Sequence, residues 1–539
     1  MDVEKKAASG AEKDSQSAIS VESHLDAREK DKVQRKLQQR HVQMIAIAGT
    51  LGTGLFLGSG FALQGAGPLG ALIAYALVGT VAYSSLCAVG EMAAFNPTSG
   101  TFPHFAARWV DKALGFAIGW NYFYGSVMAI PTEISAAAIL ITFWDDNPNH
   151  APAYIAAILV VMISFNLFGV RYFGEAEFYF CLVKIMLIIG LIIAGLVITL
   201  GGGPDRTRRG FQYWKNPGAI ARAGLVDNID ADKFLAILSV IVQAAFSFQS
   251  MELVAIAASE TESPRRNIAK AVKRVFWRIL IFYILGVLIT GMLVPYNDPE
   301  LLHETGNAAQ SPYVIAINRA RIKVLPHIIN AAIFTSAFSA GNSFLYSSSR
   351  VLFGLSIRGQ APKIFGRVTK GGLPLISVAF CSLFSLLTFM TVSNGAATVF
   401  GWLVNLTTVG GFIGWWVINC TYLCFHYGYK KQGFNRKELL YYSPLQPYLA
   451  WWGIFWATFF VVISGLQTWF KWNTSTFLTF YINIPIFIAM YFGYKVVKKT
   501  RIRRWDEMDF VTGIPTPEET EIPEVPPKNI WEKISSFIF

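Results

Sequence analysis

Residues 42–64 read VQMIAIAGTLGTGLFLGSGFALQ, and this stretch decides the class of fold. It is long enough to cross a membrane as a helix, which takes about 20 residues. Gly49, Gly52 and Gly54 fall near its middle and weaken a helix there. Unpaired backbone groups in lipid are tolerated only where they line a cavity. The stretch therefore predicts either a broken helix whose exposed N-terminus binds an anion, or close helix packing through small residues.

Similar apolar segments recur along the whole chain. Of the 539 residues, 53% are hydrophobic and only 15% are charged, against roughly 25% charged in an average soluble protein. The mean hydropathy is +0.42. These values exclude a soluble enzyme, a disordered protein and an ordinary nucleic-acid-binding protein. They predict an all-α polytopic membrane protein with about 12 transmembrane helices. The expected segments are 42–64, 68–94, 114–143, 152–171, 177–200, 234–257, 275–295, 325–349, 374–393, 396–424, 448–470 and 474–496.

The loops between these segments set the orientation. Lys and Arg cluster in 259–278, 350–370 and 429–437, which are alternate loops. The positive-inside rule makes that face cytoplasmic. We therefore expect a cytoplasmic tail over 1–41, a transmembrane domain over 42–496 and a second cytoplasmic tail over 497–539. One loop disagrees, because residues 202–233 should be external yet hold six Lys and Arg against four Asp.

Two side-chain expectations follow from this orientation. Arg265, Arg266 and Lys270, in an amphipathic helix, are expected to face lipid headgroups or solvent. Glu91, near the end of the second segment, is expected to be an inner gate or a loop anchor.

Motifs for catalysis or metal binding are not apparent. The five cysteines and seven histidines show no metal-ligand spacing. Phosphate-binding, dinucleotide and nucleophile-elbow patterns lack a plausible context. We expect no catalytic residues, no cofactor, no metal and no nucleic-acid partner.

A second weak point lies in the sixth segment, where Phe246 to Glu252 read FSFQSME. A charged Asp at the centre of a membrane helix costs about 2.5–3.5 kcal/mol on insertion scales, and Glu should be comparable. Glu252 either stabilises a break in this helix or is satisfied by a neighbouring helix. Breaks at matching positions of two halves are typical of secondary transporters. One break with free N–H groups and one with carbonyls would bind a zwitterion such as an α-amino acid.

Other polar residues at membrane depth have two possible roles each. Lys184 either extends to the membrane surface or is a buried group that takes and releases a proton. Glu133 either binds substrate or supports a backbone break. Asn342, Trp402 and Thr408 either join helices or line the pocket for the substrate side chain.

Several motifs together resemble the fungal amino acid permease family, within the amino acid–polyamine–organocation superfamily. They are residues 41–58, Gly90 to Phe95, Gly201 to Pro204, the region from Glu252 to Arg266, and Ala361 to Lys363. The resemblance covers about residues 40–510.

The resemblance implies the leucine-transporter fold, with two inverted five-helix repeats and two extra helices. It implies proton-coupled uptake of amino acids across the plasma membrane by alternating access. The substrate carboxylate would bind at Thr50, Gly52, Thr53 and Gly54. The ammonium group would meet carbonyls around Phe246, Ser247 and Phe248, and the ring of Phe246 would close the site. Lys184 falls where proton-coupled relatives carry a lysine.

The substrate and the partners are less sharply defined. Residues 210–214 and 295–299 resemble the branch for acidic amino acids, whereas Pro131 to Glu133 resemble broad-range members. A carboxylate in the site disfavours acidic substrates, so we expect neutral or broad specificity. The alternative is an amino acid sensor with the same fold, although the short tails favour transport. The expected partners are the amino acid, protons and the lipid bilayer, and a ubiquitin ligase or its adaptor at Lys5, Lys6 or Lys13.

Overall fold

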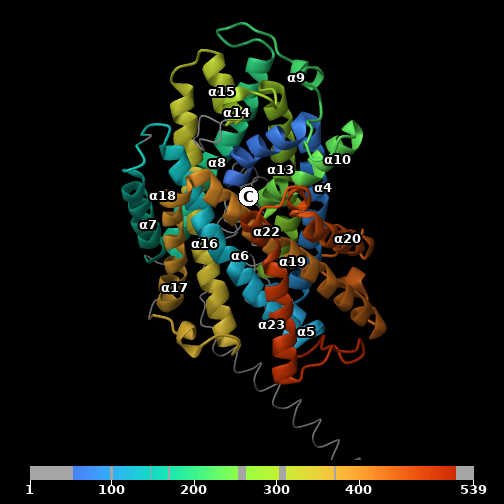
Figure 1. Ribbon diagram of the computed structural model, residues 1–539. Coiled ribbons are helices and arrows are strands. Elements are labelled where there is room, and N and C mark those ends of the chain that lie inside the picture. Colours follow the sequence, from blue (N-terminus) through green and yellow to red (C-terminus); the bar gives the residue numbers. More distant parts are fainter. Residues whose placement is uncertain are drawn as a thin grey trace, which may run out of the picture.

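The computed structural model describes residues 52–97, 101–145, 147–167, 170–252, 263–302, 311–369 and 372–516. Within these ranges every regular element is a helix (Figure 1). The prediction of an all-α membrane protein is confirmed. Eight helical stretches are long and apolar enough to cross a membrane, and three shorter apolar helices accompany them.

The first of these stretches comprises two crossings. Helix α3 spans Thr53–Phe56 and α4 spans Gly58–Phe95. Inside α4, Gly67 has φ +75° and Pro68 follows it, so two helices meet at this point. A Cβ on Gly67 would lie 2.7 Å from the backbone nitrogen of Ala221, which leaves no room for a side chain. With this turn, the eight long stretches and the three shorter helices fall in the twelve segments in which crossings are predicted.

The remaining crossings are of two kinds. Six are single helices: α6 Lys112–Ile141, α7 Ala151–Leu167, α8 Val170–Thr199, α13 Pro264–Leu293, α16 Leu325–Ile357 and α19 Ala396–Lys431. Four are interrupted: α10 Ile229–Ser239 with α11 Ile241–Phe248, α17 Leu375–Ser385 with η3 Leu386–Met390 and α18 Thr391–Asn394, α20 Tyr448–Ile463 with α21 Leu466–Phe470, and α22 Thr474–Tyr481 with α23 Asn483–Lys498.

Short connecting helices gather at the two ends of the bundle. Figure 1 shows α9 (Gln212–Lys215), α14 (Pro299–Leu302) and α15 (Pro312–Arg319) at one end, which we call the α15 end. Helix α5 (Thr101–Trp109) lies at the opposite end, which we call the α5 end. The loops that contain α9, α14 and α15 therefore lie at the opposite end from the loop that contains α5, in agreement with the predicted alternation of loops between the two faces.

The cation-rich loop at the α15 end neutralises part of its own charge. Arg209 pairs with Asp205 at 2.5 Å, and Arg222 pairs with Asp232 at 3.0 Å. Two of the six cations that contradict the positive-inside count thus have acidic partners in the same segment. The positive-inside rule counts Lys and Arg and gives Asp little weight, so this loop remains an exception to it.

The loop between α19 and α20, with η4 (Arg436–Glu438), is fixed by a buried acid at the α5 end. Glu91 is 0% exposed and accepts hydrogen bonds from Arg436 Nε at 2.6 Å and Arg436 Nη2 at 3.0 Å. The backbone N–H of Ser443 and the hydroxyl of Tyr422 also donate to this carboxylate. Glu91 therefore anchors this loop.

Residues 501–516 pack back onto the α5 end. Arg108 donates to the carbonyls of Asp509 at 3.0 Å and Thr512 at 2.6 Å. Phe510 is 5% exposed and lies among aromatic rings of α5 and α19, including Trp109 and Phe425. Part of the expected C-terminal tail is thus a packed element.

The expectation for Arg265 is wrong. Its side chain is buried and donates to the carbonyl of Pro515. The segment 501–516 covers this residue, and a pattern of local charge does not reveal a partner 250 residues away.

Candidate functional site

The first helix break lies where the glycines predict it. Gly52 has an extended conformation, with φ −110° and ψ −158°, and α3 begins at Thr53. The first N–H groups of a helix lack partners within that helix and carry a partial positive charge. Thr53 and Gly54 are both buried, so these groups lie inside the protein. Thr50, which was also expected here, lies outside the described residues.

The second break follows α11. This helix ends at Phe248, and Gln249 leaves the helical path with ψ 151°. Ser250 has φ +67°, an uncommon conformation for a residue other than glycine. Residues 249–252 form turns rather than helix, and Glu252 is the last of them. The polar run from Phe246 to Glu252 thus coincides with a helix end.

The two breaks touch each other. A Cβ on Gly54 would lie 2.8 Å from both Cα and Oγ of Ser247. The hydroxyl of Tyr75 lies 3.2 Å from the carbonyl oxygen of Gly54, to which it donates, and 3.1 Å from Ser247 Oγ. Residues nearly 200 positions apart therefore form one buried site. Glycine at position 54 is required by this close approach.

The carbonyls at the end of α11 are partly occupied. Ser247 O accepts a hydrogen bond from the hydroxyl of Tyr283 at 2.6 Å, and Phe246 O accepts one from Gln249 N at 3.3 Å. A carbonyl oxygen has two lone pairs, so each can accept a second donor. An ammonium group would find acceptors here.

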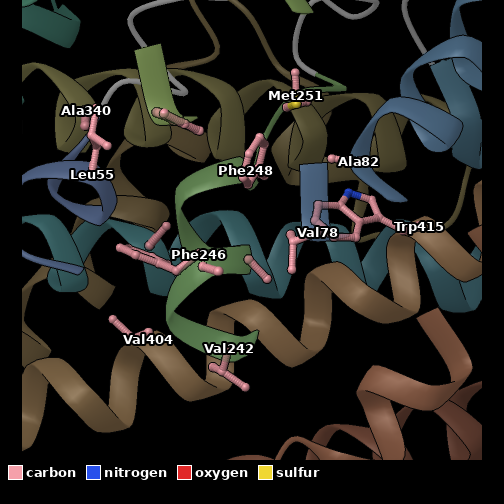
Figure 2. Close-up of a cluster of buried hydrophobic side chains, with 14 of the residues drawn as sticks. Leu55, Val78, Ala82, Val242, Phe246, Phe248, Met251, Ala340, Val404 and Trp415 are labelled. Carbon is pink, nitrogen blue, oxygen red and sulfur yellow. The ribbon is translucent and has the colours of Figure 1, made fainter. Parts of the chain in front are cut away.

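The two phenylalanines of this helix have different surroundings. Figure 2 shows Phe246 and Phe248 projecting from different sides of α11. Phe248 is 0% exposed, with its ring centroid 4.7 Å from that of Tyr283. Phe246 is 7% exposed and faces Phe400 of α19 at 6.1 Å. Of the two rings, only that of Phe246 retains some access.

Glu133 of α6 lies against the first break. A Cβ on Gly52 would be 2.8 Å from Glu133 Oε1. The side chain is 2% exposed, and its Oε2 has no hydrogen-bond partner among the described residues. A carboxylate next to a helix N-terminus is favoured electrostatically. This acid therefore lies where it can support the break.

Lys184 of α8 is 0% exposed, so it does not extend to the membrane surface. That alternative is excluded. Its charge interacts with those of Glu177 on the same helix and of Glu133 on α6. Lys184 thus connects, through Glu133, to the first helix break.

Glu252 lines a separate small cavity of about 30 Å³. That volume suffices for about two water molecules. Tyr122 of α6 and Trp415 of α19 also line it, whereas Gly52, Thr53 and Gly54 do not. Gln249 also lines this cavity, and its side-chain amide donates a hydrogen bond to the carbonyl of Thr408 at 3.5 Å.

The remaining predicted residues lie in three different surroundings. Asn342 of α16 bonds to Glu177 and to Asn166 of α7. Thr408 is 0% exposed, and its hydroxyl has no partner among the described residues. Trp402 is partly exposed.

Sequence reasoning missed three buried polar residues near these breaks. Tyr75 and Tyr283 bind the break backbones, but nothing distinguishes them from other tyrosines in apolar segments. Glu177 is 0% exposed, yet the fifth segment was expected to begin at residue 177, which put this acid at the membrane edge. Its spacing of seven residues from Lys184 was the available signal, because residues seven apart share a helix face.

The fold and the paired breaks define the class of protein. The structure is similar to a manganese transporter from Eremococcus coleocola, with a TM-score of 0.55 and 12% identity, over 85% of this chain and 94% of that chain. This likeness shows the fold, which is a leucine-transporter-type fold. Breaks in matching helices near mid-membrane are the usual binding site of such transporters.

The sequence places the chain within a family. A family model described as amino acid permease matches residues 41–507, so the chain belongs to the amino acid permease family. It is 39% identical to a dicarboxylic amino acid permease of Saccharomyces cerevisiae, over 90% of this chain and 80% of that protein.

Other relatives carry different substrate names. The chain is 38% identical to a proline-specific permease of the same yeast, over 94% of this chain and 83% of that protein. It is also 38% identical to a lysine/arginine permease of Candida albicans, over 94% of this chain and 90% of that protein. The protein is a multi-pass membrane transporter and not an enzyme.

Proposed function

We propose that this protein takes up amino acids together with protons across the plasma membrane by alternating access. The observation that carries the proposal is the contact between the two helix breaks, where Gly54 meets Ser247. The N-terminus at Thr53 supplies N–H groups for a carboxylate, and the end of α11 supplies carbonyls for an ammonium group. An α-amino acid carries both charges on neighbouring atoms, so it matches the two breaks together.

Lys184 is the proposed proton-coupling group. It is completely buried, and it interacts with two acids, Glu177 and Glu133. A lysine can release a proton from its ammonium group and take one up again as a neutral amine. Because Glu133 interacts with Lys184 and also lies against Gly52, a change of protonation at Lys184 would alter the field at the break proposed to bind the substrate carboxylate.

The proposed substrates are neutral amino acids, or a broad range of them, rather than acidic ones. Glu133 places a carboxylate against the break that is to receive the substrate. A second carboxylate on the substrate side chain would add like-charge repulsion in a site shielded from water, where Coulomb interactions are strong. The names of the relatives cover acidic, basic and proline substrates, so they do not favour one substrate class. The proposal of neutral or broad specificity therefore depends on Glu133.

The proposed topology has the α5 end in the cytoplasm, together with the tails over 1–41 and 497–539. The excess of Lys and Arg in alternate loops supports it. Regulation through ubiquitin at Lys5, Lys6 or Lys13 remains a proposal, and those residues lie outside the described ranges.

The test is uptake of a panel of radiolabelled amino acids by cells that lack their own permeases, with and without an uncoupler. Accumulation of neutral amino acids that the uncoupler abolishes is the expected result. Uptake that persists with the uncoupler would contradict the coupling. If no amino acid accumulates but the cells still respond to external amino acids, the protein is a sensor with the same fold.

A further inference from the structure

Glu177 is an acid in the interior of the bundle that the proposed transport cycle has not yet used. It lies on α8 and is 0% exposed. Its Oε2 accepts a hydrogen bond from Ser339 Oγ at 2.7 Å, and its Oε1 accepts one from Asn342 Nδ2 at 3.0 Å. Both donors belong to α16. Asn342 is held in turn by Asn166 of α7, 2.6 Å away.

These partners are all neutral. Burying a carboxylate is expensive unless a charge compensates it or it becomes protonated. Within the described part of the chain, the cation that interacts with Glu177 is Lys184. The thiol of Cys181 lies between them on the same helix, and Glu133 faces Lys184 from α6. The region therefore holds two acids and one lysine in a setting without solvent exposure.

Glu177 and Lys184 share one face of α8, because they are seven residues apart. Seven residues span about 10 Å along the helix axis. Long side chains in a helix lean toward its N-terminus, which directs the lysine toward Glu177. Helix α8 ends at Thr199 near the α15 end, so Glu177 lies two turns further than Lys184 toward the opposite end.

One turn nearer to the α5 end than Glu177 lies a stacked pair of aromatic rings. One turn earlier on α8, Phe173 stacks on Tyr346 of α16, with ring centroids 4.1 Å apart and an interplanar angle of 8°. The guanidinium of Arg350 lies 4.8 Å from the centroid of Tyr346. Phe173 is 1% exposed.

We infer that Glu177 is the relay acid through which the proton leaves Lys184 toward the cytoplasm. This inference rests on the proposed function and adds the exit route to it. Lys184 gives up one proton, which breaks an N–H bond and leaves a neutral amine. Glu177 accepts that proton on a carboxylate oxygen, through a water molecule where the two groups do not touch. Opening of the Phe173–Tyr346 stack then lets Glu177 release the proton to cytoplasmic water.

The hydrogen bonds from Ser339 and Asn342 suit this role. They hold the carboxylate at a fixed position between α8 and α16 without supplying a charge that would keep it ionised. A purely structural acid would be replaceable by the neutral amide of Gln, which has nearly the same shape. A relay acid would not be replaceable by Gln, because an amide does not take up and release a proton as a carboxylate does.

The test uses Glu177→Gln in the full-length protein reconstituted into liposomes, with Glu300→Gln as the matched control, because Glu300 is an acid on α14 whose side chain is 57% exposed. Two activities are measured for each variant: accumulation of a labelled amino acid driven by an imposed proton gradient, and exchange of labelled for unlabelled amino acid without a gradient. Exchange requires no net proton movement. We expect Glu177→Gln to keep exchange within about twofold of the unsubstituted protein and to lose at least about tenfold in accumulation, while Glu300→Gln keeps both.

Three results would overturn the inference. One is normal accumulation by Glu177→Gln, and another is a parallel loss of exchange and accumulation, which indicates a structural role. The third applies if Glu177→Gln does not fold: Glu177→Asp, which retains a carboxylate, must then fold and accumulate, and failure to accumulate contradicts the relay. If the unsubstituted protein ignores the gradient, the proposed function itself fails and this inference falls with it.

Discussion

Gly54 is the residue at which the geometry of the site is most sharply constrained. A Cβ there would meet the backbone of Ser247 at 2.8 Å. Backbone atoms cannot move aside as a flexible side chain can, so the two breaks would have to separate. Overpacking of this kind costs about 1–3 kcal/mol.

Gly54→Ala is therefore expected to lower amino acid uptake by about tenfold, which corresponds to about 1.4 kcal/mol. The matched control is Gly190→Ala on α8, where an added Cβ meets no atom within 4 Å. Initial rates of uptake at equal surface expression are the measurement. Equal rates for Gly54→Ala and Gly190→Ala would refute the close contact of the breaks.

Glu133 controls charge at the same site. Replacing it with Gln removes a buried negative charge next to Gly52 and keeps the shape of the side chain. Uptake of aspartate relative to alanine is expected to rise by about tenfold, because like-charge repulsion of this order is typical at a few ångströms inside a protein. Competition assays with both substrates measure the ratio.

The control for this substitution is Glu300→Gln on α14, an acid whose side chain is 57% exposed. It should leave the aspartate-to-alanine ratio unchanged. An unchanged ratio in Glu133→Gln would show that this carboxylate does not face the substrate.

At the scale of elements, the loop between α19 and α20 depends on one buried ion pair. Glu91 is 0% exposed and Arg436 is 17% exposed. Removing one partner of a buried pair typically costs about 3–5 kcal/mol, because the other charge remains without compensation. Arg436→Gln should therefore lower the thermal stability of the detergent-solubilised protein clearly, and Glu91→Gln together with Arg436→Gln should restore part of it. A double variant less stable than Arg436→Gln alone would argue against the pair.

The segment 501–516 makes a second prediction at this scale. Phe510 is 5% exposed, whereas its neighbour Val511 is 74% exposed. Truncating a buried Phe typically costs about 3–5 kcal/mol. Phe510→Ala should accordingly lower the melting temperature by several degrees, and Val511→Ala should not. Equal melting temperatures for the two variants would mean that this segment does not pack in the membrane-embedded protein.

For the whole molecule, hydropathy was sufficient to predict the helical fold and the twelve crossings. In lipid, each backbone N–H and C=O group of a helix must be paired within that helix. A helix that crosses the membrane also needs about 20 predominantly apolar residues in a row, and such a run can be recognised in the sequence. The positions of the two breaks were also predictable, because glycines and a polar run weaken a helix wherever it packs.

The contacts between distant segments were not predictable from the residues. Ser247 lies beside Gly54, and Arg265 lies beneath Pro515, only because helices far apart in the sequence pack together. Glu177 was overlooked for a different reason. The predicted segment begins at Glu177, whereas α8 begins at Val170 and Glu177 is completely buried. From the sequence alone, a charged residue at the end of an apolar segment can lie either at the membrane surface or in a polar cluster between helices.

The central claim is that amino acid and proton move together through the paired breaks, with Lys184 as the coupling group. The most direct measurement is accumulation of a labelled neutral amino acid by liposomes that contain the purified protein, under an imposed proton gradient. The account predicts accumulation that collapses when an uncoupler is added, and loss of accumulation but not of exchange in Lys184→Ala. Gradient-driven accumulation by Lys184→Ala equal to that of the unsubstituted protein would contradict it.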